Sequence, residues 1–333
     1  MNKTYLFITA LFVLIFMSCQ SRKKNNAEKQ NEIELVAEKQ LVFPLDEQTY
    51  YLSKSMFQFE ENGKEYLHFE NTRKSLYDIV IFDIENKQIA KRIPLHKTGP
   101  NGLPAVYGSR PSPDSKQILI SQNNIGRLST INNQGEVVHN YPVKTPEGRF
   151  TTFFFCSYYN APAFVKDSCI FLNQGIFKPN MKREDWPQTH MFASQNLETG
   201  KFEWVPIFYP PIFKEEYENI DGGYGFSYDY NYKESRLVCG FFGYDSLMVT
   251  DDLKHIRWYN AKSKYLKSMK PKLGNAMAGI NSIIEFCEAP MYWHIMYDKY
   301  RDVYYRFAEM PYKLAPNESP YDEPKGKEFS VIV

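Results

Sequence analysis

A loop at residues 96–102, HKTGPNG, contains the residue types of an anion site. Lys97 supplies a cation, and Gly99 and Gly102 allow the backbone to approach a ligand closely. A phosphate loop of the type Gly-x-x-x-x-Gly-Lys-Ser/Thr, however, leads into a helix whose amino terminus faces the anion. Here Pro100 interrupts the run and strand-like residues follow. Because Gly-Pro and Asn-Gly are strong turn signals, we expect this loop to be a corner between two sheets.

A second candidate is the tyrosine-rich stretch GGYGFSYDYNYKES, residues 222–235. Tyr228, Tyr230 and Tyr232 occupy alternate positions, so in a strand their rings would point to one side, where they could stack on sugar rings. The same row arises where an aromatic sheet packs against its neighbour. We favour the packing interpretation.

The segment YDKYRDVYYRF, residues 297–307, carries Asp298 and Asp302 on either side of Tyr300 and Arg301. Carboxylate oxygens gathered at a loop can coordinate a cation. Two aspartates with cationic residues between them more often form a solvated turn with local ion pairs. We expect such a turn here.

The histidines are scattered singly, and no pair is spaced as His-x-His or His-x-x-x-His. They are His68, His96, His139, His190, His255 and His294. A lone histidine on a strand is usually structural, so we expect no metal site and no cofactor. There is no Gly-x-Ser-x-Gly elbow for an esterase nucleophile, and no catalytic residue is predicted.

Four cysteines follow Cys19 in the chain, and none belongs to a Cys-x-x-Cys pair. They are Cys156, Cys169, Cys239 and Cys287. A bridge between Cys156 and Cys169 would suit an oxidising compartment. Buried free thiols are the interpretation we favour.

The amino terminus has the pattern of an export signal. An apolar run from Tyr5 to Met17 is too short for a hydrocarbon core that needs about 20 residues. Ser18 followed by Cys19 fits a lipoprotein signal in which residues 1–18 are removed and Cys19 is acylated. An uncleaved anchor or a plain secretory signal is the alternative. Either way, the protein is expected to be exported.

Residues 19–38 are polar and lack aromatic side chains, so they read as a flexible tether rather than a folded segment. The residues just after Cys19 are basic, Arg22, Lys23 and Lys24 among them. In the lineage that this signal resembles, acidic residues at this position would suggest export to the cell surface. We therefore expect a protein anchored by lipid to the outer membrane and facing the periplasm.

The charge balance argues against one class of partner. The chain has 40 basic and 39 acidic residues, and nucleic-acid binding depends on an excess of cations that neutralise phosphates. No nucleic-acid partner is expected. Aromatic residues make up 16% of the chain, and these residues favour strands.

Short alternating or aromatic runs, bounded by Gly, Asn, Asp and Pro, recur along residues 39–333 in sets of four. The second run of each set begins near residues 65, 117, 168, 236 and 302. Four antiparallel strands in a meander make one propeller blade, and a recurring unit of this length is typical of propellers. A two-sheet sandwich would explain the alternation but not the recurring order. The sequence therefore predicts an all-β protein, a β-propeller of about five to six four-stranded blades.

The last set has no fourth run, so the last blade is expected to be incomplete. In propellers the ring is commonly sealed by a strand from the other terminus, and QLVFPL at residues 40–45 could serve. Alternatively the chain is a truncated product.

Several stretches together resemble a known family. They are FPLD near the start, IPLHKTGPNG after the first set, and YWHIMYDKYRDVYYRFA with FSVIV near the end. The chain resembles the outer-membrane lipoprotein family of Bacteroidetes catalogued as domain of unknown function 4221, which is similar to six-bladed propeller lipoproteins. That resemblance implies a propeller in the cell envelope, and it brings no reaction, cofactor or catalytic residue.

We expect a non-catalytic envelope lipoprotein that binds a protein or a glycan partner through the loops of one face. Residues on the first strand of each blade would line the central opening. The ligand-binding candidates are Arg110, Tyr158, Tyr228 and His294, with Arg306 as a neighbour. The rival hypothesis is a propeller glycosidase or polysaccharide lyase, which needs carboxylates that converge at the channel. A third possibility is an inactive truncated copy.

Overall fold

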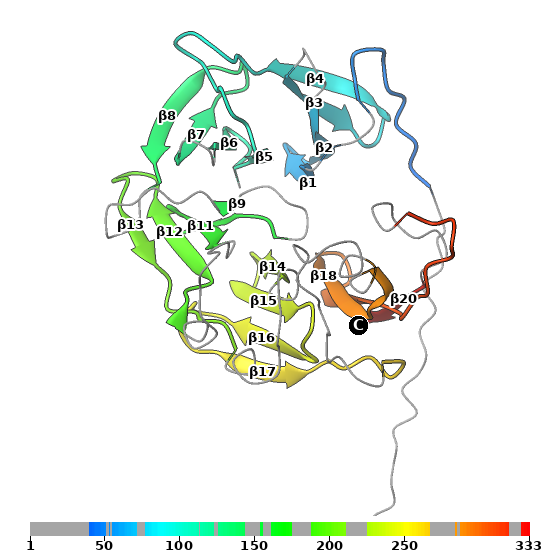
Figure 1. Ribbon diagram of the computed structural model, residues 1–333. Coiled ribbons are helices and arrows are strands. Elements are labelled where there is room, and N and C mark those ends of the chain that lie inside the picture. The colour runs from blue at the N-terminus through cyan, green and yellow to red at the C-terminus, as the bar shows by residue number, and fades with distance from the viewer. Residues whose placement is uncertain are drawn as a thin grey trace, which may run out of the picture. The chain divides into compact units, whose positions relative to one another are not determined.

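The computed structural model describes most of the chain from residue 40 onward (Figure 1). The described residues are 40–50, 53, 55–71, 77–112, 114–122, 126–143, 154–155, 161–174, 188–210, 225–266, 284, 287–319 and 328–333. The chain divides into two units, Met1–Val42 and Phe43–Val333, and every described strand belongs to the second. The predicted signal, Cys19 and the whole of the predicted tether lie outside the described residues.

The second unit is a β-propeller, as the sequence predicts. The described strands form five antiparallel sheets that follow one another around a ring, with the first strand of each sheet innermost (Figure 1). The first sheet contains β1 (Met56–Glu61), β2 (Lys64–Asn71), β3 (Asp78–Asp83) and β4 (Gln88–Pro94). The second contains β5 (Gly108–Pro111), β6 (Ile118–Gln122), β7 (Arg127–Ile131) and β8 (Val137–Pro142). The third contains β9 (Phe154–Phe155), β10 (Phe164–Lys166), β11 (Cys169–Gln174), β12 (Phe192–Asn196) and β13 (Phe202–Trp204). The fourth contains β14 (Phe226–Asn231), β15 (Arg236–Phe241), β16 (Ser246–Thr250) and β17 (Arg257–Asn260). The fifth contains β18 (Met291–Asp298), β19 (Val303–Glu309) and β20 (Phe329–Ile332).

The hairpin between β1 and β2 illustrates how the sequence specifies the strands. Its register pairs Glu61 with Lys64, which leaves only Asn62 and Gly63 in the turn. Both turn residues have positive φ, 53° and 76° respectively. This backbone suits the Asn-Gly pair of a type I′ turn, whose twist matches that of the flanking strands.

The third sheet differs from its prediction at the inner edge. The third set of runs begins with TTFFFCSYY, residues 151–159, which predicts one first strand. The structure instead has two short segments, β9 and β10, that both pair with β11. The turn from β10 to β11 consists of Asp167 and Ser168, which both have positive φ.

The predicted closing strand is not a strand. Residues 40–45 form no strand, and the fifth sheet has the order β18-β19-β20 among the described residues. Phe43 instead packs on Phe82 of the first sheet, with ring centres 5.4 Å apart. Phe43 is thus used in side-chain packing rather than in strand pairing, whereas Leu41, Val42 and Leu45 are exposed.

The hydrophobic core is a series of layers between neighbouring sheets. On β6, Ile118 and Ile120 pack against the first sheet, and Leu119 packs against the third. Phe226 and Tyr228 of β14 likewise join a cluster with the third sheet. A strand with a sheet on either side buries both of its faces, so its side chains are apolar at consecutive positions rather than in strict alternation.

Two negative findings apply to this part of the chain. The described residues contain no helix long and apolar enough to cross a membrane. They also contain no cluster of three or more histidine, cysteine, aspartate or glutamate side chains able to hold a metal ion.

Candidate functional site

The two ends of the strands differ in the length of the connections they carry. In an antiparallel meander, successive connections alternate between the two ends of the strands. One set is short, with no member above six residues: 62–63, 84–87, 112–117, 132–136, 167–168, 197–201, 232–235, 251–256 and 299–302. The other set includes long segments: 72–77, 95–107, 123–126, 143–153, 175–191, 205–225, 242–245, 261–290 and 310–328. We call the corresponding surfaces the short-turn face and the long-connection face.

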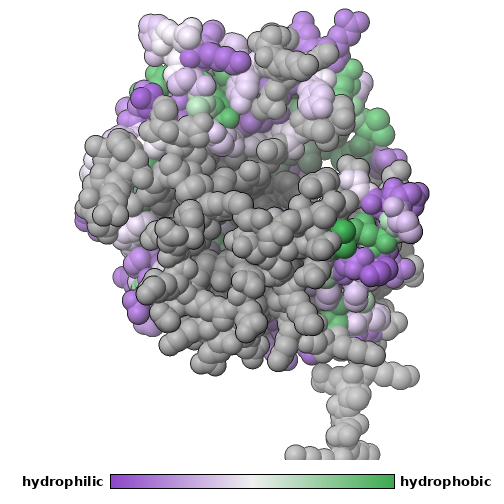
Figure 2. Space-filling model, viewed as in Figure 1, coloured by the Kyte–Doolittle hydropathy of each residue, from purple (hydrophilic) through white to green (hydrophobic). Residues whose placement is uncertain are grey.

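Long connections are where propellers and other rigid scaffolds carry their binding residues. The surface drawn in colour in Figure 2 is largely hydrophilic, with hydrophobic residues only in small groups. Extended apolar patches on a surface mark interfaces with membranes or large partners. The coloured surface instead suits contacts made at individual pockets.

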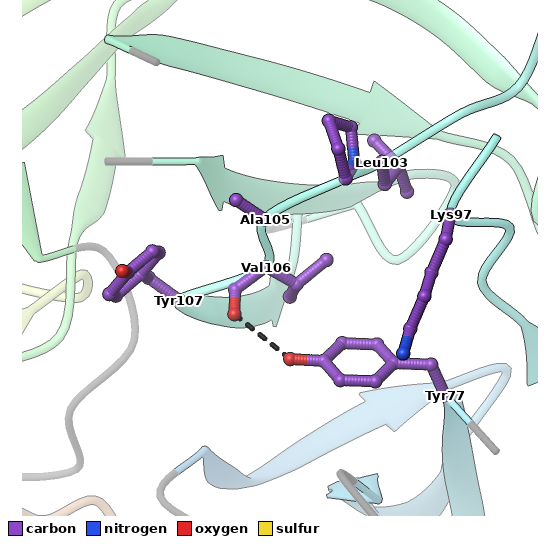
Figure 3. Close-up of a pocket in the computed structure, with 7 residues that line it drawn as sticks. Tyr77, Lys97, Leu103, Ala105, Val106 and Tyr107 are labelled. Carbon is purple, nitrogen blue, oxygen red and sulfur yellow. Dashed lines mark hydrogen bonds between the residues drawn. The ribbon is translucent and has the colours of Figure 1, made fainter. Parts of the chain in front are cut away.

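One such pocket lies on the long-connection face between the first and second sheets (Figure 3). Its volume is about 290 Å³. Its walls are Tyr77, Lys97 and the segment from Leu103 to Tyr107. Tyr77 ends the connection 72–77, and the other residues belong to the connection 95–107, so two connections of the same face build the site.

The predicted corner forms one end of this pocket. The N–H of Leu103 donates to the carbonyl of His96 at 2.6 Å, and the N–H of Gly102 donates to the carbonyl of Gly99 at 2.9 Å. Gly99 has a φ of 88°, which side-chain-bearing residues rarely adopt. The loop is therefore closed on itself as a turn, and strand β5, not a helix, follows it.

Tyr77 is held in place by its hydroxyl group. The Tyr77 Oη donates to the carbonyl of Val106 at 2.9 Å (Figure 3). Burial raises the pKa of Tyr77 to about 12, and the neighbouring Glu70 and Tyr107 add to the increase. The Tyr77 hydroxyl thus remains a donor at any physiological pH.

Lys97 extends from the loop towards the same ring. Its Nζ lies 5.6 Å from the centre of the Tyr77 ring, within the range of a cation–π contact (Figure 3). Tyr107 projects from the far side of Val106 and is 40% exposed, so it lies at the rim. The site therefore combines an aromatic wall, a cation and backbone polar groups.

Among the residues singled out from the sequence, Arg110 connects three sheets. It lies on β5 in the second sheet, and its guanidinium lies 5.2 Å from the centre of the Phe57 ring on β1. It also donates to the carbonyl of Ala163, just before β10. Arg110 is half-buried and is engaged in contacts between sheets.

Tyr228 and Arg306 are buried inside the molecule. Tyr228 is fully buried, and its Oη donates to the carbonyl of Ala161 at 3.1 Å. Arg306 is 2% exposed, and its guanidinium donates to four backbone carbonyls. Burial lowers the pKa of Arg306 to about 10, so it stays charged at neutral pH. These contacts give both residues a structural role at their positions.

His294 is half-buried on β18, with the ring centres of Trp293 and Phe307 5.9 Å and 6.3 Å away. Burial lowers the pKa of His294. Tyr158 lies outside the described residues. The described candidates are spread over three sheets, and none of them lines the pocket of Figure 3.

Asp229 is a carboxylate within a first strand, β14, where a propeller hydrolase would need one. Its Oδ2 accepts the N–H of Tyr297 at 2.9 Å, and its Oδ1 accepts the N–H of Tyr230 at 2.8 Å. Burial raises the pKa of Asp229, while these two hydrogen bonds and the charge of Arg110 oppose that increase. Asp229 therefore joins β14 to the inner edge of β18.

The aspartate-containing hairpin is a turn with local ion pairs, as expected. Asp298 accepts from the N–H groups of Tyr300 and Arg301, and Arg301 also forms an ion pair with it at 2.8 Å. Asp302 forms an ion pair with Lys233 at 2.9 Å. Both carboxylates already have cationic or N–H partners.

A buried polar cluster between the first and second sheets was not anticipated. Ser109 Oγ donates to Glu70 Oε2 at 2.9 Å and lies 2.8 Å from His68 Nε2. Burial lowers the pKa of His68 to about 3, and the charge of Arg110 lowers it further. Ser109 and His68 are fully buried and the serine lies between the other two, so the cluster lacks the order and access of a hydrolase triad.

The thiols of Cys169 and Cys239 are free, and Cys239 is fully buried. The considered bridge from Cys169 to Cys156 involves a residue outside the described part of the chain. The favoured interpretation, a buried free thiol, holds for Cys239, whereas Cys169 is free but only half-buried.

The sequence profile of a family described as domain of unknown function DUF4221 matches residues 32–333. The chain belongs to this family. A crystal structure of a DUF4221 member from Bacteroides vulgatus ATCC 8482 is 84% identical to it, with a TM-score of 0.85. That alignment covers 91% of this chain and 84% of the other.

More distant structures are similar to this DUF4221 protein only at low identity. A candidate exported protein from Bacteroides fragilis NCTC 9343 is 11% identical, with a TM-score of 0.49 over 81% of this chain and 74% of the other. Hydrazine synthase from Kuenenia stuttgartiensis is 8% identical, with a TM-score of 0.41 over 86% and 64% respectively. A search of curated proteins found no match.

Family membership agrees with the resemblance found in the sequence. The resemblance also pointed to six-bladed propellers, whereas the described residues of this DUF4221 protein form five sheets. The pocket residues Tyr77 and Tyr107 were missed because nothing in their sequence spacing connects them. The nearest signal was the cluster of turn residues at 98–102 that separates them.

Proposed function

We propose that this DUF4221 protein is a non-catalytic binding module of the cell envelope that holds a protein or glycan ligand on its long-connection face. The observation that carries the proposal is the pocket of Tyr77, Lys97 and residues 103–107. It lies on the face with the longest connections, and it brings the ring of Tyr77 and the ammonium group of Lys97 together, with Tyr107 at its rim. The short turns of the opposite face offer little surface for recognition.

The contacts of the polar residues support binding over catalysis. Asp229, Arg306 and the cluster around Ser109 use their polar atoms to join neighbouring sheets. A glycosidase needs two carboxyl groups about 5 to 10 Å apart at an accessible site. Among the described first strands, Asp229 lies within β14, and its carboxylate accepts two backbone N–H groups. The other carboxylates, Glu60, Glu61 and Asp298, lie at the ends of β1 and β18 next to the short turns.

The location in the envelope rests on the amino-terminal sequence. In the proposal, lipidated Cys19 anchors the protein to the outer membrane, facing the periplasm, through the tether 19–38. If Cys19→Ala left the protein as firmly bound to membranes as the wild type, this part of the proposal would be wrong.

The test of the binding function compares the two faces. Tagged wild-type protein is cross-linked in intact cells, and captured proteins and glycans are identified by mass spectrometry. One variant set carries Lys97→Ala and Tyr107→Ala on the long-connection face. The matched set carries Lys116→Ala and Gln134→Ala on exposed positions of the short-turn face.

We expect a reproducible partner that the first variant set loses and the second retains. Loss with both sets, or with neither, would contradict binding through the long-connection face. Hydrolysis of envelope polysaccharides by the purified protein would favour the enzyme instead.

A further inference from the structure

We infer that the pocket between Tyr77 and Lys97 binds one carboxylate-bearing sugar unit of a glycan. This inference rests on the proposed binding function and names its ligand class. It depends on the size of the pocket, on the position of the Tyr77 ring and on the donors that surround the space.

The size of the pocket limits the ligand to about one sugar ring. Its volume of about 290 Å³ is at the lower end of the range for small-molecule sites. A folded peptide or a second protein surface would not enter a space of this size. A single pyranose ring with its substituents would fill it, and the rest of the glycan would extend into solvent.

The apolar wall suits the C–H face of a sugar. Tyr77 contributes its ring, and Leu103, Pro104 and Val106 contribute aliphatic surface. The hydrogen bond from Tyr77 to the Val106 carbonyl holds the ring against the 103–107 segment, so little side-chain freedom is lost when a ligand binds. An ordered aromatic ring is a favourable stacking surface because it is large and already immobile.

The polar groups favour an acidic sugar over a neutral one. Lys97 is exposed and forms no ion pair within the described residues, so its ammonium group is available to a ligand. The backbone N–H groups of Ala105 and Val106 also make no hydrogen bond within that part of the chain. All three are donors, and a carboxylate is an acceptor that strengthens each such bond by its charge.

The same donors could bind inorganic phosphate, so the ligand must be tested against it. Phosphate has no apolar face to place against Tyr77, and it would gain only the polar part of the interaction. A uronate uses both parts. The expected order of affinity is therefore uronate first, with phosphate and neutral sugar both weaker.

The experiment titrates the folded protein with methyl glucuronide, methyl glucoside and inorganic phosphate, with binding followed by calorimetry or NMR. We expect methyl glucuronide to bind in the millimolar range, about tenfold tighter than methyl glucoside, because one charge-assisted hydrogen bond contributes about that factor. Lys97→Gln should remove the preference. Lys116→Gln, at an exposed lysine on the short-turn face, should retain it.

A second variant tests the aromatic wall. Tyr77→Leu should weaken both sugars by about tenfold while leaving phosphate unchanged, because it removes the stacking surface and keeps Lys97. Circular dichroism of each variant checks that the propeller is folded. Tyr107→Ala, at the rim, provides a folded alternative if Tyr77→Leu does not fold, and it should weaken the sugars to a smaller extent.

Three outcomes would overturn the inference: equal binding of glucuronide and glucoside, tighter binding of phosphate than of glucuronide, or glucuronide binding that Lys97→Gln does not change. A protein partner captured through the long-connection face, together with no sugar binding, would also overturn it. In that last case the proposed function would stand, so the two can fail independently.

Discussion

The guanidinium carbon of Arg306 lies 3.4 Å from the centre of the Tyr292 ring. Both residues belong to the fifth sheet, and Arg306 donates from there to carbonyls at Asp245 and Ala261, around the outer strands of the fourth sheet. A buried arginine is thus one of the links between these two blades, beside the hydrogen bond from Tyr297 to Asp229. Its contribution to the free energy of unfolding can be measured.

Arg306→Met is expected to lower the free energy of unfolding by about 3 kcal/mol or more, because it leaves several buried carbonyls without a donor. Arg306→Lys should lose less, since it keeps the charge but cannot reach every carbonyl at once. Urea unfolding measures both. Arg257→Met, which breaks an exposed ion pair with Asp251, serves as the control and should cost below about 1 kcal/mol. Equal losses for Arg306→Met and the control would contradict a structural role for Arg306.

The first and fifth sheets meet through a polar contact that should depend on pH. Gln58 donates to Tyr300 Oη at 3.1 Å, and Lys299 forms an ion pair with Glu65 at 3.1 Å. The hydrogen bond from Tyr300, and then Lys299, lowers the pKa of Glu65 from its ordinary 4.5. A lowered carboxyl pKa contributes stability above about pH 4.5, and this contribution is lost as the pH falls through the folded-state value.

Glu65→Gln should therefore reduce the free energy of unfolding at pH 7 by less than about 1 kcal/mol, as is usual for exposed pairs. In strong acid the variant and the wild type should have the same free energy of unfolding, because Glu65 is then protonated. Thermal unfolding at both pH values measures the difference. Glu60→Gln, on an exposed position of the same hairpin and outside this contact, is the control. A difference that persists unchanged in acid would show that Glu65 does not act through its charge.

Asp229 should show the opposite pH dependence. Burial raises its pKa, so the folded protein holds this proton more tightly than the unfolded chain does. Stability from this group is present at low pH and is lost as the pH rises from about 3.8 through the folded-state value. Asp229→Asn removes the ionisation, so the variant should gain stability relative to wild type between pH 3 and pH 7.

Denaturant unfolding between pH 3 and pH 7 measures whether Asp229→Asn is more or less stable than the wild type. Asp114→Asn is the matched control, because a hydrogen bond from Ser112 lowers the pKa of Asp114. This second variant should lose stability relative to wild type over the same range. If the stability of both variants relative to wild type changed with pH in the same direction, the proposed role of burial at Asp229 would be ruled out.

The turn between β7 and β8 approaches the first sheet closely at Gly135. This glycine has a φ of 83°, and a Cβ placed on it would lie 2.1 Å from the carbonyl oxygen of Pro94. Gly135→Ala is expected to cost more than about 2 kcal/mol, since the oxygen belongs to backbone and cannot move aside cheaply. Gly200→Ala is the control, because Gly200 has a φ of 72° but open space around it.

The control should cost about 1 kcal/mol from backbone strain alone. Both variants carry the backbone strain of a positive φ, and Gly135→Ala alone adds the steric clash with Pro94. The difference between their free energies of unfolding therefore measures that clash. A Gly135→Ala protein as stable as the Gly200→Ala protein would indicate that the two sheets can move apart at this point.

Much of the architecture follows from local sequence. The Asn62-Gly63 pair specifies a two-residue hairpin, and the glycine and proline residues at 99–104 specify a corner. Glycine and asparagine tolerate the positive φ that such turns need, and proline fixes φ, whatever surrounds them. The order of strands within each sheet follows from such turns. The sequence also correctly predicted that Asp298 would close a turn through its own neighbours.

Tertiary structure decided what local patterns could not. Tyr228 and Arg306 carry the residue types of a binding site, yet the neighbouring sheets bury them and occupy their polar atoms. Tyr77 and Lys97, in contrast, belong to separate connections and form a pocket only when the first two sheets stand side by side. A side chain's exposure is set by residues distant in sequence, so the sequence determined the blades, and their packing around the ring decided which side chains can reach a ligand.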